Sequence, residues 1–85
     1  MTARVEVYVA IDAERLRQQA KWNCSHGHGY GDCSSAKVSE SIKATVLGEE
    51  CGEVCRAMLD GDAVGLRREL VQVAAVAVAW LEGLE

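Results

Sequence analysis

Proline is absent from all 85 residues of the chain, of which 49% are hydrophobic and 26% are charged. This composition favours packed helices over a disordered tail or a sandwich of strands and turns. A chain of this length forms one domain, but it buries only about 60% of the surface that its unfolded form exposes. We therefore expect a single helical domain over residues 1–85, with a small core that a partner chain helps to cover.

Long clusters of Lys or Arg and long apolar runs are also missing. The net charge of −4 argues against a protein that coats nucleic acid phosphates. Near the N-terminus, Arg4, Glu6 and Asp12 interrupt the apolar residues, so the segment lacks the apolar core of a secretory signal. The longest apolar run, residues 71–81, includes Gln72 and falls short of the roughly 20 residues that cross a bilayer. We expect a cytoplasmic protein whose partners include neither nucleic acid nor a membrane.

Cysteine is present at four positions, but a disulfide framework requires a secretory context that the sequence does not offer. Reduced thiols or a metal site fit better. Four side chains of the kind that bind zinc fall within ten positions, namely Cys24, His26, His28 and Cys33. Their spacing differs from the common zinc fingers, so a zinc site and an ordinary flexible loop are both open. Cys51 and Cys55 lie one helical turn apart and are expected to be buried as small apolar side chains.

A first helix is expected from Arg4 to Trp22, where helix-forming residues predominate. Its apolar residues recur at roughly helical intervals, at Val5, Val9, Leu16 and Ala20. The following segment, residues 23–35, is rich in Cys, His and Gly and is expected to be a loop, because closely spaced glycines make a regular helix costly. A loop of about a dozen residues often carries function.

Two further helices are expected after this loop. The second begins at a cap formed by Ser34 or Ser35 and ends at Leu59. The sequence Asp-Gly-Asp at residues 60–62 then supplies a stop, a turn and the next N-cap. The third helix follows over residues 63–84, and so short a link makes it an antiparallel neighbour of the second.

Acidic residues fall on the apolar faces of both of these helices. On the second helix, Glu50 and Glu53 share a face with Ile42, Val46 and Ala57. On the third, Glu69 lies among the apolar residues and Gln72 at their edge; those apolar residues are Leu66, Val73, Val76, Ala77 and Trp80, the last of which is expected in the core. Carboxylates that converge in an apolar setting require cationic partners or a bound cation, and oxygen ligands favour Mg²⁺ or Mn²⁺. The alternative is ordinary salt bridges with Lys43, Arg56, Arg67 or Arg68.

The segments VLGEECGEVCRAMLDGD and LRRELVQVAAVAVAWLEGL resemble the core of the MazG-like nucleoside triphosphate pyrophosphohydrolases. That family carries Glu-x-x-Glu on one helix and Glu-x-x-Asp on the next. Glu50 and Glu53 match the first half, and Glu49 is the acid that often precedes it. Glu69 opens the second half, where Gln72 replaces the family's Asp. The segment ERLRQQAKW is similar to the lead-in helix of short family members from phages and actinobacteria.

The resemblance implies an all-α fold, a helical hairpin preceded by an N-terminal helix, which assembles into a bundle as a homodimer or higher oligomer. It also implies hydrolysis of a nucleoside triphosphate to the monophosphate and pyrophosphate, with Mg²⁺ or Mn²⁺ as cofactor. The implied metal ligands are Glu50, Glu53, Glu69 and Gln72. The implied catalytic residues are Glu49 and Glu50, with Glu49 either as the base or as a group behind the ligands.

Gln72 offers an oxygen but no charge, so two other functions stay open. One is a catalytically weak regulator of the same fold that binds a nucleotide or a metal, and the other is an interaction module with a zinc loop. For a nucleotide, Trp22 could stack on the base, and Lys21 or Lys37 could reach a phosphate. Packing in the core or exposure on a solvated surface is the alternative for each, and residues 23–35 could also contact the nucleotide.

Overall fold

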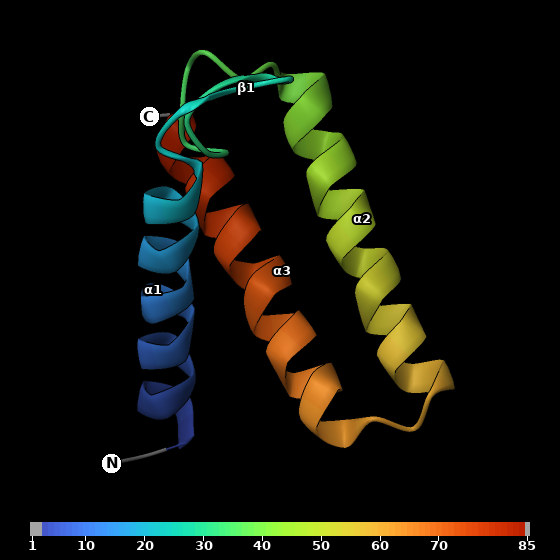
Figure 1. Ribbon diagram of the computed structural model, residues 1–85. Helices are drawn as coiled ribbons and strands as arrows, with labels where there is room; N and C mark the ends of the chain where they lie inside the picture. Colours follow the sequence, from blue (N-terminus) through green and yellow to red (C-terminus); the bar gives the residue numbers. More distant parts are fainter. Residues whose placement is uncertain (1–2, 85) are drawn as a thin grey trace.

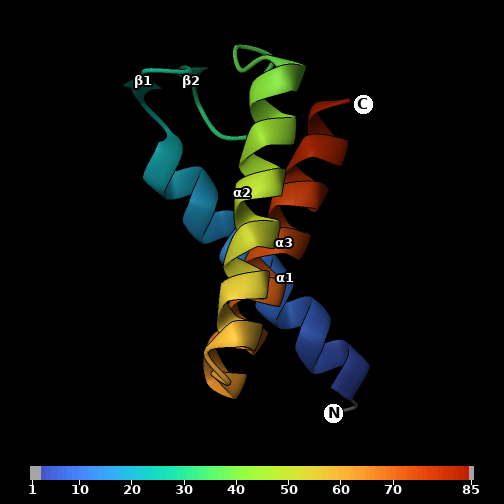
Figure 2. The same ribbon diagram turned by 90° about the vertical axis from the view of Figure 1, so that its right-hand side faces the viewer.

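The computed structural model describes residues 3–84, which form three helices and one small antiparallel hairpin. The elements in chain order are α1 (Ala3–Trp22), β1 (Ser25–His26), β2 (Gly29–Tyr30), α2 (Glu40–Leu59) and α3 (Ala63–Gly83). In Figure 1, α3 lies between α1 and α2, and the hairpin lies at the end where α1 stops and α2 begins. Figure 2 shows that α1 crosses α3 obliquely. The fold is mostly helical as predicted, but the hairpin means that it is not all-α.

The core is built on α3, which packs against both other helices. Small side chains permit this close approach: Ala75 and Ala79 are 0% and 1% exposed, and Val76 is 4% exposed. Because α1 and α2 cover α3 from two sides, only Val78 and Leu81 of the apolar run 71–81 are exposed.

The link between α2 and α3 has the predicted chemistry. Asp60 caps the C-terminus of α2, Gly61 adopts a φ of 64°, and Asp62 caps α3 by accepting a hydrogen bond from the Gly65 N–H at 2.8 Å. The predicted start of α2 was wrong, since its N-cap is Ser39, whose hydroxyl accepts from the Ile42 N–H at 3.2 Å.

Ser34 and Ser35 were the caps expected for α2, but both bind within the preceding turns instead. The Ser34 hydroxyl donates to Asp32 at 2.6 Å, and the Ser35 hydroxyl donates to the Tyr30 carbonyl at 2.5 Å. Because both hydroxyls are engaged in these bonds, neither is available to cap the first turn of a helix. The hairpin itself pairs Ser25 with Tyr30 and His26 with Gly29.

An ionic cluster around the buried Arg15 connects α1 to the rest of the chain. The Arg15 guanidinium, 5% exposed, contacts the Glu82 carboxylate of α3 at 3.0 and 3.1 Å. It also donates to the carboxylate of Asp32, in the turns after the hairpin. The Asp32 side chain is 6% exposed. The fork geometry of Arg permits both contacts at once. Lys43 of α2, 1% exposed, places its ammonium near Gly83 at the C-terminal end of α3.

Two predicted buried faces are exposed instead. On α1, the side chains of Val5, Val9, Leu16 and Ala20 face solvent, and the inward residues are Ala10, Ile11, Glu14, Arg15 and Gln18. On α2, the thiols of Cys51 and Cys55 are exposed, because α3 covers only one side of that helix. Trp80, expected in the core, is half-buried, and its indole N–H donates to Glu40 at 2.5 Å. No helix within residues 3–84 is long and apolar enough to cross a membrane.

Candidate functional site

A cleft of about 470 Å³ lies between α1 and α2, with α3 as its floor and the hairpin region at one end. The polar side chains of its two walls come from α1 and α2, the helices on either side of α3. The lining residues are Arg17, Gln18, Lys21 and Trp22 of α1; His26, His28, Gly31, Asp32, Cys33 and Val38 of the connection; Ile42, Thr45, Val46, Glu49 and Glu50 of α2; and Gln72 and Val76 of α3. The volume falls within the range of small-molecule sites.

Glu50, Glu69 and Gln72 meet where α2 and α3 face each other. The hydrogen-bonding pattern requires the Gln72 amide nitrogen to face the carboxylates, because its oxygen would otherwise oppose their oxygens. In this orientation Gln72 donates to Glu69 at 2.8 Å and to Glu50 at 3.1 Å. One amide thus bridges acids from two helices, so three of the four residues expected to form a metal site, all but Glu53, lie together.

Glu50 is half-buried and carries an unfavourable negative charge. Burial raises the pKa of its carboxyl, and the neighbouring carboxylates Glu69, Glu49, Glu53 and Glu14 raise this pKa further. Among residues 3–84, no ion pair engages Glu50, whereas the Glu69 carboxylate lies 3.7 Å from the Arg68 guanidinium. The salt-bridge alternative therefore describes Glu69 in part but not Glu50.

The α1 wall of the cleft carries positive charge. Arg17 and Lys21 line it one turn apart, together with Trp22. The Arg17 guanidinium donates two hydrogen bonds of 2.7 Å to Glu14, and this contact lowers the pKa of Glu14. The cleft thus has cations on one wall and acids on the other, an arrangement suited to a ligand that carries both phosphates and a metal ion.

The four candidate zinc ligands, all within residues 3–84, are not grouped so that they could hold a metal ion. The His26 Nδ1 accepts the His28 backbone N–H at 3.2 Å, so its Nε2 carries the proton and donates to the Gly31 carbonyl at 2.7 Å. Both ring nitrogens are therefore engaged within the hairpin. Cys24 is exposed, and burial raises the pKa of the half-buried Cys33 thiol, which favours its protonated form. The zinc alternative gains no support from these residues.

The other predicted site residues divide into two groups. Glu49, Lys21 and Trp22 line the cleft. Glu53 is exposed and does not line it, and Lys37 lies 5.8 Å from the Tyr30 ring, also outside the lining. Of the predicted site residues, Glu49, Glu50, Gln72, Lys21 and Trp22 line the cleft, whereas Glu53, Glu69 and Lys37 do not.

Glu50, Glu69 and Gln72 offer a divalent cation a partial set of ligands and do not form a closed cage around it. Within residues 3–84, no three His, Cys, Asp or Glu side chains are grouped so that they could hold a metal ion. Mg²⁺, however, commonly uses one or two carboxylates together with water and substrate phosphates. Burial and the neighbouring carboxylates disfavour the negative charge of Glu50, as the raised pKa of its carboxyl indicates, and a cation beside it would offset that repulsion.

Several residues at the cleft were missed by the sequence analysis. Arg17 and Gln18 follow Glu14 at helical spacing, a signal that places them on one face of α1. No local sequence pattern identifies Asp32, because its role depends on contact with Arg15, which lies 17 positions earlier in the chain.

Searches against models of protein families, curated protein sequences and solved structures find no match to this chain.

Proposed function

We propose that this protein is a metal-assisted hydrolase that acts on the phosphoanhydride bonds of a nucleotide. Within that class, the site favours a nucleoside triphosphate pyrophosphohydrolase, which releases the nucleoside monophosphate and pyrophosphate. The observation that carries the proposal is the convergence of Glu50 and Glu69 on Gln72 beside a cleft with cationic residues on its other wall. The resemblance of the acidic motif to the MazG-like family adds the reaction type.

The chain's own residues supply distinct parts of this chemistry. Glu50 and Glu69, with the carbonyl oxygen of Gln72 after rotation of its amide, would hold Mg²⁺ or Mn²⁺, which neutralises phosphate charge and lowers the pKa of water when bound. Glu53 is close enough to raise the pKa of Glu50 and contributes negative charge. Glu49 lines the cleft and is placed to accept a proton from water that enters it.

The α1 wall binds the substrate in this proposal. Arg17 and Lys21 offer positive charge to phosphate oxygens, and Trp22 offers an aromatic surface to the base. The half-buried position of Glu50 reduces its contact with water and so strengthens its interactions with charge inside the cleft.

The proposal is tested by measuring pyrophosphate release from a panel of nucleoside triphosphates with Mg²⁺ or Mn²⁺. We expect metal-dependent release by the wild type and its loss, by about a hundredfold or more, in Glu50→Gln and Glu69→Gln. Glu6→Gln is the matched control, because Glu6 is an exposed acid in the first turn of α1. If the panel gives no metal-dependent release, the pyrophosphohydrolase is the wrong activity.

A nucleotide-binding protein without turnover is the second candidate. It is favoured by one observation: the Gln72 amide donates hydrogen bonds to both Glu50 and Glu69. These two carboxylates therefore depend less on a bound metal than the acids of a site with Asp at this position would. Calorimetric titration with a nonhydrolysable triphosphate separates the two, since this candidate predicts binding without pyrophosphate release.

A further inference from the structure

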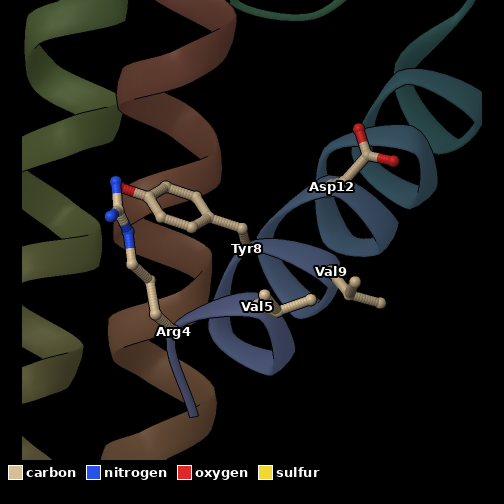
Figure 3. Close-up of a pocket in the computed structure, with 5 residues that line it drawn as sticks. All are labelled: Arg4, Val5, Tyr8, Val9 and Asp12. Atoms are coloured by element: carbon tan, nitrogen blue, oxygen red, sulfur yellow. The ribbon is translucent and has the colours of Figure 1, made fainter. Parts of the chain in front are cut away.

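A second depression lies on α1, away from the cleft. Figure 3 shows the five residues that line it, Arg4, Val5, Tyr8, Val9 and Asp12. The Arg4 guanidinium lies 5.6 Å from the centroid of the Tyr8 ring. All five residues come from one helix, so no facing wall encloses a ligand there.

The outer face of α2, by contrast, carries three sulfur side chains. Cys51, Cys55 and Met58 follow one another at intervals of four and three residues. Residues at these intervals lie on the same face of a helix, with the Cβ atoms of neighbours about 5–6 Å apart. Both thiols are free and exposed, and Met58 is 62% exposed. Cys and Met are usually found in apolar interiors, so packing does not account for three of them on one solvent-facing surface.

Two glycines leave the space beside the thiols open. Gly48 precedes Cys51 by three residues, and Gly52 precedes Cys55 by three. A helical side chain leans toward the N-terminus, over the positions three and four residues before it, so each thiol has a neighbour without a side chain. A Cβ added at either glycine would meet no side chain or other segment of residues 3–84 within 4 Å. Gly is unfavourable in a helix interior, and close packing does not explain these two, whereas access to the thiols does.

The chemistry of these ligands selects a soft metal ion. Thiolate and thioether sulfurs favour Cu(I) over hard cations such as Mg²⁺. A structural Zn²⁺ site would require four ligands, and the part of the chain that the structure describes groups no three His, Cys, Asp or Glu side chains around a common point. We propose that Cys51 and Cys55 form a site for one Cu(I) ion, with Met58 as a third sulfur ligand. Each Cys binds as its thiolate, so its proton passes to solvent.

The proposed copper site is separate from the cleft. Neither of its thiols lines the cleft, nor does Met58, and Glu49 and Glu50, which do line it, lie on another side of α2. Cu(I) binding therefore neither requires a nucleotide nor competes for the carboxylates proposed to hold Mg²⁺ or Mn²⁺. Failure of the activity proposed for the cleft would leave the copper site unaffected.

Competition with a chromophoric Cu(I) chelator, in the absence of oxygen, measures the binding. The wild type should withdraw one equivalent of Cu(I) per chain from the chelator. Cys51→Ser and Cys55→Ser should each weaken this binding by about a hundredfold or more, because each removes a ligand. Met58→Leu keeps the size of the side chain but removes its sulfur, and it should weaken the binding by about tenfold.

Cys24→Ser is the matched control, because Cys24 is also free and exposed but lies outside the helices. It should leave the affinity for Cu(I) unchanged, and circular dichroism should show the same helicity in all variants. X-ray absorption of the copper complex should report sulfur neighbours alone. Nitrogen neighbours would place the ion at His26 and His28 and overturn the proposal. A wild type that takes no Cu(I) from the chelator would also overturn it, as would a Cys24→Ser variant that binds as weakly as Cys51→Ser.

Discussion

At the scale of single residues, Gln72 occupies the point where acids of α2 and α3 come together. The hydrogens of its amide group carry partial positive charge, and the amide nitrogen donates them to Glu50 and Glu69 at 3.1 and 2.8 Å. In the metal-free protein the amide N–H groups stabilise both carboxylates through hydrogen bonds, as a bound cation would through its charge. In the proposed metal-bound state the amide would have to turn and present its oxygen, so the metal-free and metal-bound states would compete.

Replacing Gln72 by Asp should reverse the balance between these states. Gln72→Asp removes the donor and adds a third carboxylate, so the metal-free variant should lose about 1–3 kcal/mol of unfolding free energy. Magnesium should bind more tightly to the variant and raise its melting temperature more than that of the wild type. Calorimetric titration and melting curves with and without Mg²⁺ measure both effects.

Gln19→Asp is the matched control, since Gln19 is exposed on α1. It should change neither magnesium affinity nor the magnesium-dependent shift in melting temperature. An equal response of both variants would place Gln72 outside the cation site.

Glu50 should make stability depend on pH in a defined direction. Its pKa in the folded state is raised above the ordinary value of 4.5 by burial and by its acidic neighbours. The folded state therefore prefers the protonated carboxyl, and this stabilisation is complete below pH 4.5 and is lost as the pH rises through the folded-state pKa. Glu50→Gln removes the titration, so the variant should gain stability over the wild type as the pH rises from 4.5 to 7.

Melting temperatures of the two proteins across this range, without metal, give the measurement. The comparison isolates Glu50, because both proteins retain Glu14, whose lowered pKa produces the opposite trend. A difference in melting temperature that does not change with pH would contradict the assignment.

At the scale of the elements, the sequence predicted what depends on local chemistry. The bounds of α1 and α3 and the Asp60-Gly61-Asp62 link follow from propensity and capping, whereas the start of α2 was predicted four or five residues too early. The antiparallel packing of α2 on α3 follows from the short link. The inward face of α1 was missed because Arg15 and Gln18 are polar, whereas the apolar residues Val5, Val9 and Leu16 face solvent. A hydrophobic pattern identifies a face that must be covered, but it does not say whether the same chain covers it.

The candidate site shows the same division. Glu50, Glu69 and Gln72 could be brought together from helical spacing and a short link, because both are local. The α1 wall and the exposure of Glu53 depend on how α1 and α2 cross α3, and no local pattern encodes that crossing.

The hairpin offers a test at this scale through two neighbouring glycines. Gly29 has a φ of 129°, and a Cβ there would collide with the Lys37 carbonyl. Gly29→Ala should therefore lower the unfolding free energy by about 1–3 kcal/mol. Gly27→Ala should have little effect, because no atom lies within 4 Å of its added Cβ. Urea denaturation of both variants measures the difference, and equal stabilities would contradict the hairpin conformation.

At the scale of the whole molecule, one buried arginine joins parts of the chain that lie far apart. Arg15 and Glu82 are separated by 67 positions, and Asp32 depends on the same guanidinium for its charge compensation. Arg15→Ala leaves the buried Asp32 carboxylate without a cationic partner, although Ser34 still donates to it, and should cost about 3 kcal/mol. Arg17→Ala removes an exposed contact with Glu14 and should cost less than about 1 kcal/mol. Chemical denaturation measures the loss of unfolding free energy in each variant, and similar losses would contradict a larger contribution from the contacts of Arg15.

The position of α1 also has a consequence for the order in which the chain folds. The α2 and α3 helices are joined by a turn of a few residues and can pair while the rest of the chain is unfolded, whereas α1 must close a long loop to reach α3. We expect α1 to dock last and to detach first, as a cooperative unit of its own. Amide hydrogens of α1 should then exchange with deuterium faster than those of α2 and α3, and each detachment would remove one wall of the cleft while the acids on α2 and α3 stay in place.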